Sequence, residues 1–182
     1  MISLDQLQTP RLILRRMSAE DLDDLTRMHL DPRVMATLGG VRSPDVTREW
    51  LGRHLEHWRQ HGFGLWLAYD RETGRFAGRG GLNHVPIDDR DEIEVAYALL
   101  AEFWGRGLAT ELARESIRAA FTVLNLPELV CFTLTTNRAS QRVMQKAGFH
   151  YERDLVYKDL PHVLYRLRRA DVGDESTRET ER

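Results

Sequence analysis

A short glycine-rich stretch, FWGRGLATE from Phe103 to Glu111, carries the clearest chemical signal in the sequence. Gly105 and Gly107 stand one residue apart and lead directly into a segment whose apolar residues have helical spacing. Backbone N–H groups at the start of a helix lack partners within the helix and lie at the positive end of its dipole. Glycines let a phosphate approach these groups closely. The stretch therefore predicts a site for a phosphate-bearing ligand.

Two familiar phosphate motifs do not fit this stretch. A Walker P-loop requires a lysine after its last glycine, and none follows here. A dinucleotide fingerprint requires a third glycine where Thr110 stands, and an acidic residue after the next strand, whereas Glu128 precedes that strand. These failures disfavour a nucleotide-binding domain. Trp104 to Ala109 instead has the form x-x-Gly-x-Gly/Ala, with Gly107 and Ala109 at the small positions.

Three further side chains are candidate site residues. Ser140 shares a helix face with three apolar residues, so its hydroxyl faces inward and either bonds locally or contacts a ligand: Val143, Met144 and Ala147. Glu94 lies in a strand-like segment beside Glu92, where an exposed carboxylate is the ordinary expectation. Cys131 lies inside an apolar segment, which favours a buried small hydrophobe over a nucleophile.

These residues need strands and helices to bring them together. Period-two patterns and turn signals predict about seven strands, at residues 11–16, 65–69, 76–85, 92–100, 129–134, 151–158 and 162–168. Cap residues and apolar spacing predict about four helices, which begin near Ser18, Ser43, Gly107 and Asn137. This order predicts an α/β (α+β) fold around one mainly antiparallel sheet. We expect a single domain over residues 1–169 and a charged, disordered tail over residues 170–182.

Two of the predicted helices carry side chains with more than one interpretation. Trp50 and Trp58 share a face of the helix that runs from Ser43 to Gly62, and they either fill the core or line an acceptor pocket. On the helix after the glycine loop, two pairs have the i, i+3 spacing of ion pairs on the outer face: Glu111 with Arg114, and Glu115 with Arg118. The spacing alone does not determine which residues these side chains contact.

Composition limits the possible partners. The 182 residues suit one domain, and a net charge of −2 gives no reason to expect nucleic acid or a membrane surface. One cysteine, no signal-like N-terminus and no long apolar run predict a cytoplasmic protein. The histidines His84, His150 and His162 lack metal-ligand spacing, so no metal is expected.

Two more motifs make a resemblance specific. Asn137 to Phe149 reads N-x-x-S-x-x-x-x-x-K-x-G-F and starts thirty residues after Gly107, and Thr9 to Arg15 reads T-x-R-L-x-L-R. With the glycine loop, these motifs resemble the ribosomal-protein N-acetyltransferase (RimJ/RimL-like) branch of the GNAT superfamily, which binds acetyl-coenzyme A. The resemblance covers roughly residues 9–168.

The resemblance implies a GNAT fold, whose bent sheet is splayed open between the fourth and fifth predicted strands. It implies that pantetheine pairs with the strand backbone at Ala98, Leu99 and Leu100, where a strand N–H polarises the thioester. The pyrophosphate loop would be formed by Trp104, Gly105, Arg106, Gly107, Leu108, Ala109 and Thr110. Asn137 and Ser140 match family positions that contact the cofactor.

The resemblance also suggests catalytic roles. Glu94 approximately matches a glutamate base of some relatives. Many relatives carry a tyrosine proton donor where this sequence has Met144, which leaves Ser140 as the candidate acid. Base catalysis matters most for a lysine acceptor, with a pKa of about 10.4, because an α-amino group at about 7.7 to 8.0 is already partly deprotonated.

The predicted function is transfer of acetyl from acetyl-coenzyme A to a primary amine by direct attack in a ternary complex. The acceptor would be a protein or peptide N-terminus or a small amine, and the enzyme a monomer or homodimer. The alternative is a non-catalytic acyl-coenzyme A sensor or interaction module on the same fold. The missing tyrosine favours this alternative, whereas Ser140 and Glu94 oppose it.

Overall fold

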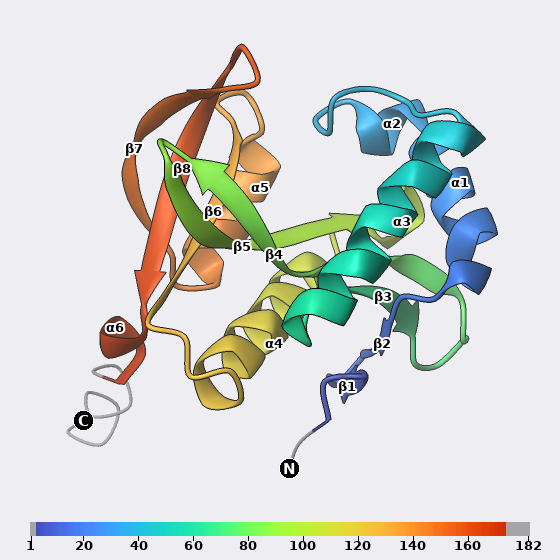
Figure 1. The fold of residues 1–182 in the computed structure, drawn as a ribbon, viewed down its shortest axis with the longest axis horizontal. Coiled ribbons are helices and arrows are strands. Elements are labelled where there is room, and N and C mark those ends of the chain that lie inside the picture. Colours follow the sequence, from blue (N-terminus) through green and yellow to red (C-terminus); the bar gives the residue numbers. More distant parts are fainter. Residues whose placement is uncertain (1–2, 174–182) are drawn as a thin grey trace.

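A computed structural model, which describes residues 3–173, contains one eight-stranded sheet with the strand order β1-β2-β3-β4-β5-β6-β8-β7 (Figure 1). All neighbouring strands are antiparallel except β5 and β6. The strands are β1 (Gln6–Gln8), β2 (Leu12–Arg16), β3 (Leu65–Asp70), β4 (Phe76–Ile87), β5 (Arg90–Leu99), β6 (Glu128–Leu134), β7 (His150–Tyr157) and β8 (Leu160–Arg168). The mainly antiparallel sheet is confirmed. The predicted count of seven missed β1, because three residues are too few to show an alternating pattern.

The four predicted helices are present, and their caps explain where they begin. They are α1 (Leu22–Leu30), α3 (Pro44–His61), α4 (Leu108–Thr122) and α5 (Arg138–Lys146). At α3, the Ser43 hydroxyl accepts a hydrogen bond from the N–H of Val46, and Gly62 ends the helix in the left-handed conformation. None of the described helices combines the length and apolar character needed to cross a membrane.

Two short helices were not predicted, α2 (Pro32–Met35) and α6 (Arg169–Gly173). At four and five residues, they span too few turns for a periodic pattern. Helix α6 includes residues 170–173, so the predicted disordered tail begins too early in the chain. The rest of that predicted tail, 174–182, lies outside the described residues.

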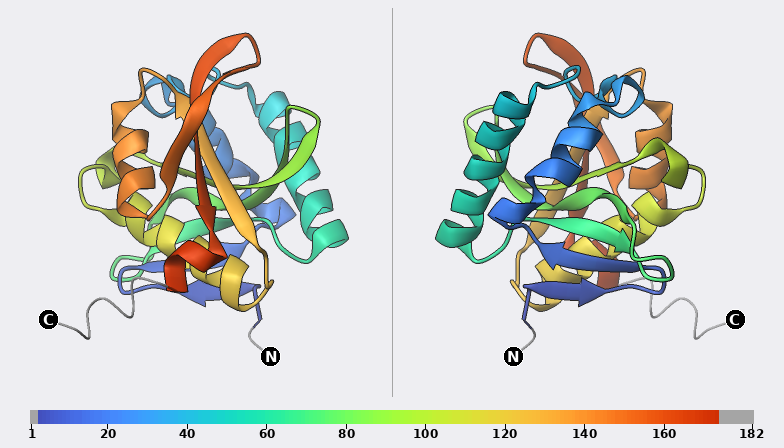
Figure 2. Two further views of the ribbon diagram at one scale, coloured as in Figure 1. Left: turned by 90° about the vertical axis from the view of Figure 1, so that its left-hand side faces the viewer. Right: turned by 90° about the vertical axis from the view of Figure 1, so that its right-hand side faces the viewer.

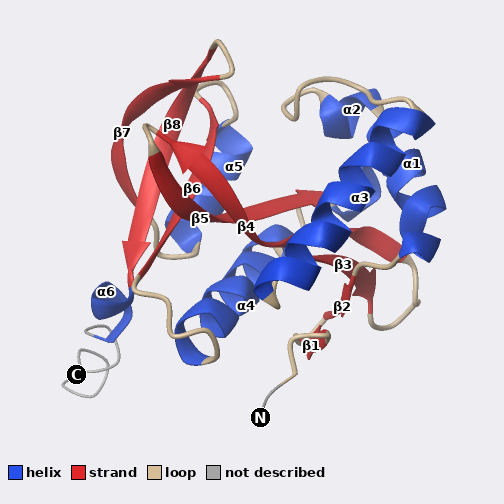
Figure 3. Cartoon of the chain, in the orientation of Figure 1, coloured by secondary structure: helices blue, strands red, loops and turns tan. Residues whose placement is uncertain are grey.

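The helices form two layers on opposite faces of the sheet, with α1 to α3 on one face and α4 and α5 on the other (Figures 2 and 3). Gly80 in β4 permits close packing on the second face, since an added Cβ would lie 2.4 Å from Leu112 of α4. On the first face, the guanidinium of Arg79 in β4 lies 4.6 Å from the ring centroid of Trp50 in α3. Successive residues of β4 thus point to different helical layers.

The sheet is splayed between β5 and β6, as the resemblance implied. The two strands pair at Glu94 and Val130 and at no other described position. The C-terminal half of β5 therefore presents an unpaired backbone edge to a gap. An unpaired edge of this kind can bind an extended ligand through main-chain hydrogen bonds.

Beyond the splay, one buried arginine ties four strands together. Arg166 of β8 donates to Glu92 of β5 (2.9 Å) and Glu128 of β6 (2.8 Å), and it also pairs with Glu152 of β7. Its side chain is only 8% exposed. The carboxylates raise the pKa of Arg166, chiefly through the hydrogen bonds that its guanidinium donates to Glu92 and Glu152.

Replacing Arg166 with methionine should lower the free energy of unfolding by about 3 kcal/mol, because three carboxylates lose a buried partner. Urea denaturation of both proteins measures the difference. Arg168→Met is the matched control, since the side chain of Arg168 is 65% exposed and its nitrogen lies 3.7 Å from Glu128. Equal losses in the two variants would contradict a special role for the buried network.

Candidate functional site

The predicted anion site is formed by the turn between β5 and α4. Gly105 and Gly107 adopt left-handed backbone angles, with φ of +72° and +76°, and Gly107 is the N-cap of α4. Within the described chain, no acceptor is hydrogen-bonded to the backbone N–H groups from Gly105 to Thr110. These donors at the start of a fifteen-residue helix can bind a pyrophosphate.

The N-terminal motif holds this loop in place through Glu111 in the first turn of α4. The Glu111 carboxylate accepts hydrogen bonds from the hydroxyl of Thr9 (2.5 Å), the N–H of Arg11 (2.8 Å) and the Arg11 side chain (2.7 Å). Arg11 also donates to the carbonyl of Arg106 inside the loop (2.8 Å). The predicted pairing of Glu111 with Arg114 is wrong, because Glu111 binds Thr9 and Arg11, and Arg114 instead donates to the Lys146 carbonyl.

A continuous cavity of about 1310 Å³ runs from this loop through the splay to the α3 face of the sheet. Most of the predicted site residues line it, namely Glu94, Ala98, Leu99, Trp104, Gly105, Gly107, Leu108, Ala109, Thr110, Asn137, Ser140 and Trp50. The structure therefore brings the loop, the open strand edge, α5 and α3 around one volume.

Three predicted residues lie away from the cavity. Leu100 donates its N–H to the Ala77 carbonyl, so its backbone faces β4 rather than the gap. Arg106 lies toward Asp70, 3.8 Å from its carboxylate. Trp58 is 2% exposed, since it lies two turns beyond Trp50 and reaches the core, where its indole N–H donates to Leu65. Its predicted role in substrate binding is wrong.

The open edge of β5 presents the backbone groups of alternate residues. The carbonyl of Val95 accepts a bond from the Cys131 thiol, and that of Leu99 accepts one from the Trp104 indole. The backbones of Val95, Tyr97 and Leu99 therefore face the gap, whereas that of Ala98 faces β4. Donors for a pantetheine arm or a thioester oxygen thus belong to Tyr97 and Leu99.

Tyr97 contacts Ser140 across this gap and is a site residue that sequence reasoning missed. The two hydroxyls lie 2.9 Å apart, and burial raises the pKa of Tyr97. Strand alternation places Tyr97 opposite Glu94, but no local pattern indicates that α5 packs there. Met144, at the family's tyrosine position, is 1% exposed in the core. A tyrosine hydroxyl thus reaches Ser140 from β5 instead of α5.

Asn137 supports Ser140 through the backbone. Its side-chain oxygen accepts a hydrogen bond from the Ser140 N–H (3.1 Å) as the N-cap of α5, and its amide donates to Thr133 (3.0 Å). Both ends of the amide therefore hold the start of α5 against β6. Asn137 borders the cavity, and these bonds position the serine.

Glu94 lies on the opposite face of β5 from Tyr97, toward α3. Burial raises the pKa of Glu94 to about 7, although the charges of Arg79 and Lys158 oppose the shift. The interpretation of Glu94 as an exposed strand carboxylate is wrong. The carboxylate of neighbouring Glu92 accepts a hydrogen bond from Arg166. A carboxylate with a pKa near neutrality can act as a general base.

Cys131 is a structural residue, as expected. Its side chain is 3% exposed and donates to the Val95 carbonyl at 3.0 Å, where β5 and β6 begin to separate. Burial raises the pKa of the thiol, so little thiolate forms near neutrality. The Cys131 thiol is therefore a poor nucleophile near neutral pH.

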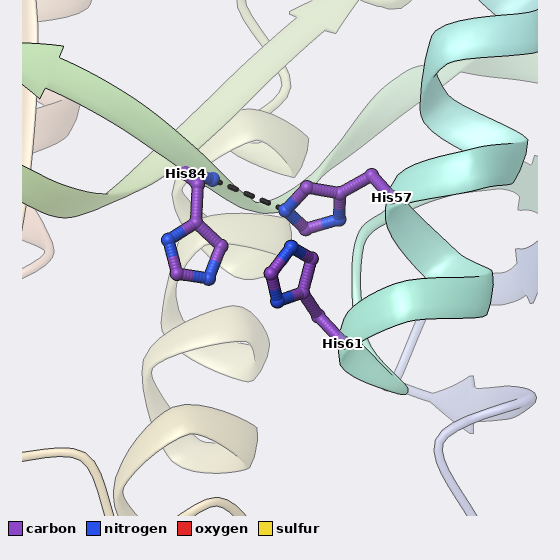
Figure 4. Close-up of side chains that lie close together, drawn as sticks. All are labelled: His57, His61 and His84. Carbon is purple, nitrogen blue, oxygen red and sulfur yellow. Dashed lines mark hydrogen bonds between the residues drawn. The ribbon is translucent and has the colours of Figure 1, made fainter.

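Three histidines, His57, His61 and His84, meet at the edge of the α3 face, whereas His150 and His162, which were considered with His84 in the sequence, are not part of this cluster. Figure 4 shows His57 and His61 of α3 beside His84 of β4. One ring nitrogen of each lies within 4.8 Å of the others. Both ring nitrogens of His57 are hydrogen-bonded, one to the Phe63 carbonyl and the other to the His84 N–H. The ring centroids of His61 and His84 lie 4.3 Å apart. The rings pack on one another, and a metal would displace the bonds of His57.

The Acetyltransferase (GNAT) domain family matches residues 11–150. The chain belongs to the GNAT acetyltransferase family. Among curated proteins, it is 32% identical to the uncharacterised protein YkkB of Bacillus subtilis over 163 residues, which is 88% of this chain and 94% of YkkB.

Solved GNAT structures share the fold. An acetyltransferase from Agrobacterium tumefaciens is 29% identical, with a TM-score of 0.80 over 93% of this chain and 97% of that one. RimL, a ribosomal L7/L12 α-N-protein acetyltransferase in complex with coenzyme A, is 18% identical, with a TM-score of 0.74 over 90% and 97% of the two chains. This protein is thus an acyltransferase of the GNAT family, and acetyl-coenzyme A is its cosubstrate.

Proposed function

We propose that this enzyme transfers acetyl from acetyl-coenzyme A to a primary amine by direct attack in a ternary complex. One observation carries the proposal: Glu94 and the Tyr97–Ser140 pair lie on opposite faces of β5 and border the same cavity. A base on the α3 face and a hydroxyl on the α5 face would flank the site of attack. Acetyl-coenzyme A supplies the acetyl group as a thioester.

Each group of residues around the cavity would have a distinct role in binding or proton transfer. The N–H groups from Gly105 to Thr110 would bind the pyrophosphate, and the N–H groups of Tyr97 and Leu99 would pair with the pantetheine arm or the thioester oxygen. Glu94 would accept the proton that the amine loses. Ser140 would donate a proton to the departing thiolate, while Tyr97 holds the serine hydroxyl in place.

The acceptor amine would be a small molecule or the N-terminus of a peptide or protein. Its route to Glu94 is the α3 side of the cavity, where Trp50 contributes a wall. Thiol release from acetyl-coenzyme A, measured with a panel of such amines, tests the proposal. Tight binding of acetyl-coenzyme A without release on any amine would favour the non-catalytic sensor instead.

Ser140→Ala should lower kcat roughly tenfold or more and leave the Kd for acetyl-coenzyme A within about twofold. A thiolate leaving group gains from protonation without requiring it, since a thiol has a pKa of about 8.5. Steady-state kinetics and calorimetric titration separate the two quantities. Ser116→Ala is the control, because that hydroxyl is buried in α4 and bonds to the Leu112 carbonyl. An unchanged kcat would reduce Ser140 to a packing residue.

A further inference from the structure

The α3 face of the cavity is rich in cationic side chains. A side pocket of about 560 Å³ shares this wall and is lined by Arg42, Trp50, Arg53, His54, His57, Asn83 and Lys158. Arg42 lies between α2 and α3, and Lys158 lies in the β7–β8 turn; Figure 1 shows both segments near the top of the molecule. No acidic residue of the described chain lines the side pocket.

The cations around this pocket lack the partners that other arginines have. Arg15 and Arg166 each pair with a carboxylate, whereas Arg42, Arg53 and Lys158 form no ion pair with any residue from 3 to 173. Nη1 of Arg42 is buried without a hydrogen-bond partner, although its Nη2 donates to the Leu38 carbonyl. The side chain thus retains an unused buried donor.

Arg79 forms the adjoining wall of the larger cavity and is the most buried of these cations. It is 6% exposed, and its Nε has no hydrogen-bond partner among the described residues. The ring of Trp50 faces its guanidinium at 4.6 Å, which offsets only part of the desolvation. An unsatisfied buried donor on a charged group is costly, so a ligand that satisfies it binds favourably.

Like charges add to this cost. Burial, together with the charge of Arg42, lowers the pKa of Arg79 to about 10. Burial likewise lowers the pKa of Arg42, with a contribution from Arg53. Among residues 3–173, Glu94 is the carboxylate whose charge opposes this shift at Arg79. The wall is therefore positive even when Glu94 is ionised.

We propose that Arg42, Arg53, Arg79 and Lys158 form an oxyanion subsite, which binds a carboxylate or phosphate group carried by the acceptor amine. The inference rests on the proposed function, because the amine of the same molecule must reach Glu94. Asn83, the cross-strand partner of Glu94, lines both the cavity and the side pocket, so anion and amine would lie in adjoining volumes. A guanidinium suits this role because it binds oxyanions through two parallel hydrogen bonds. Polycationic acceptors would be repelled.

Acceptor pairs that differ in the anion test the subsite. 4-Aminobutyrate is compared with 4-aminobutanamide, and O-phosphoethanolamine with ethanolamine, by thiol release from acetyl-coenzyme A. We expect kcat/KM to favour the anionic member of at least one pair by roughly tenfold or more, the value of one charge-assisted hydrogen bond. The pair with the larger ratio identifies carboxylate or phosphate. Ratios within about twofold in both pairs would overturn the proposal.

Substitutions test whether these arginines cause the preference for anionic amines. Arg79→Gln and Arg42→Gln should each remove most of the preference, because KM rises for the anionic amines much more than for the neutral ones. Arg48→Gln is the matched control, since Arg48 lies on α3 but pairs with Asp45 in solvent. A preference that survives in both variants would overturn the assignment of the subsite.

Failure of the proposed function can be distinguished from failure of the oxyanion subsite. Calorimetric titration of the protein–coenzyme A complex with the same four amines measures binding without turnover. Selective binding of an anionic amine that is lost in Arg79→Gln, with no thiol release, would support the subsite and refute acetyl transfer to that amine. Turnover of these amines without a preference for the anionic member of either pair would support acetyl transfer and refute the subsite.

Discussion

A Gly107→Val variant is expected to bind acetyl-coenzyme A roughly 100-fold more weakly than the wild type, which corresponds to about two lost charge-assisted hydrogen bonds. The cause is backbone conformation. Gly107 has a φ of +76°, and an added Cβ would approach only the Arg11 side chain, at 3.6 Å. A β-branched residue disfavours that φ strongly, so the loop must rearrange and misdirect its free N–H groups.

Gly74→Val provides a matched control for the strain itself. Gly74, in the turn between β3 and β4, has a φ of +69°, and an added Cβ there meets nothing within 4 Å. Both variants should lose similar thermal stability, but only Gly107→Val should lose affinity in calorimetric titration. Wild-type affinity in a folded Gly107→Val protein would refute the loop as the pyrophosphate site.

Glu94→Gln is expected to lower kcat/KM for the acceptor roughly 100-fold at pH 8, because the amine loses its general base. In the wild type, the rate should rise with pH through about 7, the pKa to which burial raises Glu94, and this limb should vanish in the variant. Initial rates from pH 5.5 to 9 measure both effects. Glu102→Gln is the control, since Glu102 pairs with Arg75 in solvent. An identical profile in Glu94→Gln would exclude Glu94 as the base.

The same shift has a consequence for stability. A carboxyl whose pKa is about 7 in the folded state, against 4.5 otherwise, holds its proton more tightly when folded. The folded state is therefore penalised as pH rises from about 4.5 to 7, and the full penalty persists above that range. Glu94→Gln removes it, so the variant should gain stability relative to the wild type at pH 8 compared with pH 5. The urea midpoints of the wild type and of Glu94→Gln, measured at pH 5 and pH 8, test this expectation.

Local patterns predicted the fold well where the signal itself was local. The caps at Ser43 and Asn137 marked helix starts that the structure confirms, and the Glu115–Arg118 pair forms as spaced. The bent, splayed sheet came from the family resemblance, because no periodic pattern in β5 or β6 shows that the two strands separate after one bridge.

The site was less predictable because its contacts join distant segments. Glu111 has helical neighbours within reach, yet it binds Thr9 and Arg11, about a hundred residues earlier. Tyr97 and Ser140 meet only because α5 packs over the gap. Arg79 carried no sequence signal at all: its burial against Trp50, and the absence of a described carboxylate partner, emerge from the tertiary structure alone.

The contact between Glu111 and the N-terminal motif determines whether the glycine loop can be transferred to another protein and keep its conformation. The loop and the first turn of α4 are contiguous in the chain, but their orientation is set by Thr9 and Arg11. A graft of residues 103–111 into another scaffold would transfer the glycines without the brace that aims the N–H groups. In engineering terms, the smallest transplantable unit is discontinuous: it combines residues 9–11, which precede β2, with the loop and the first turn of α4.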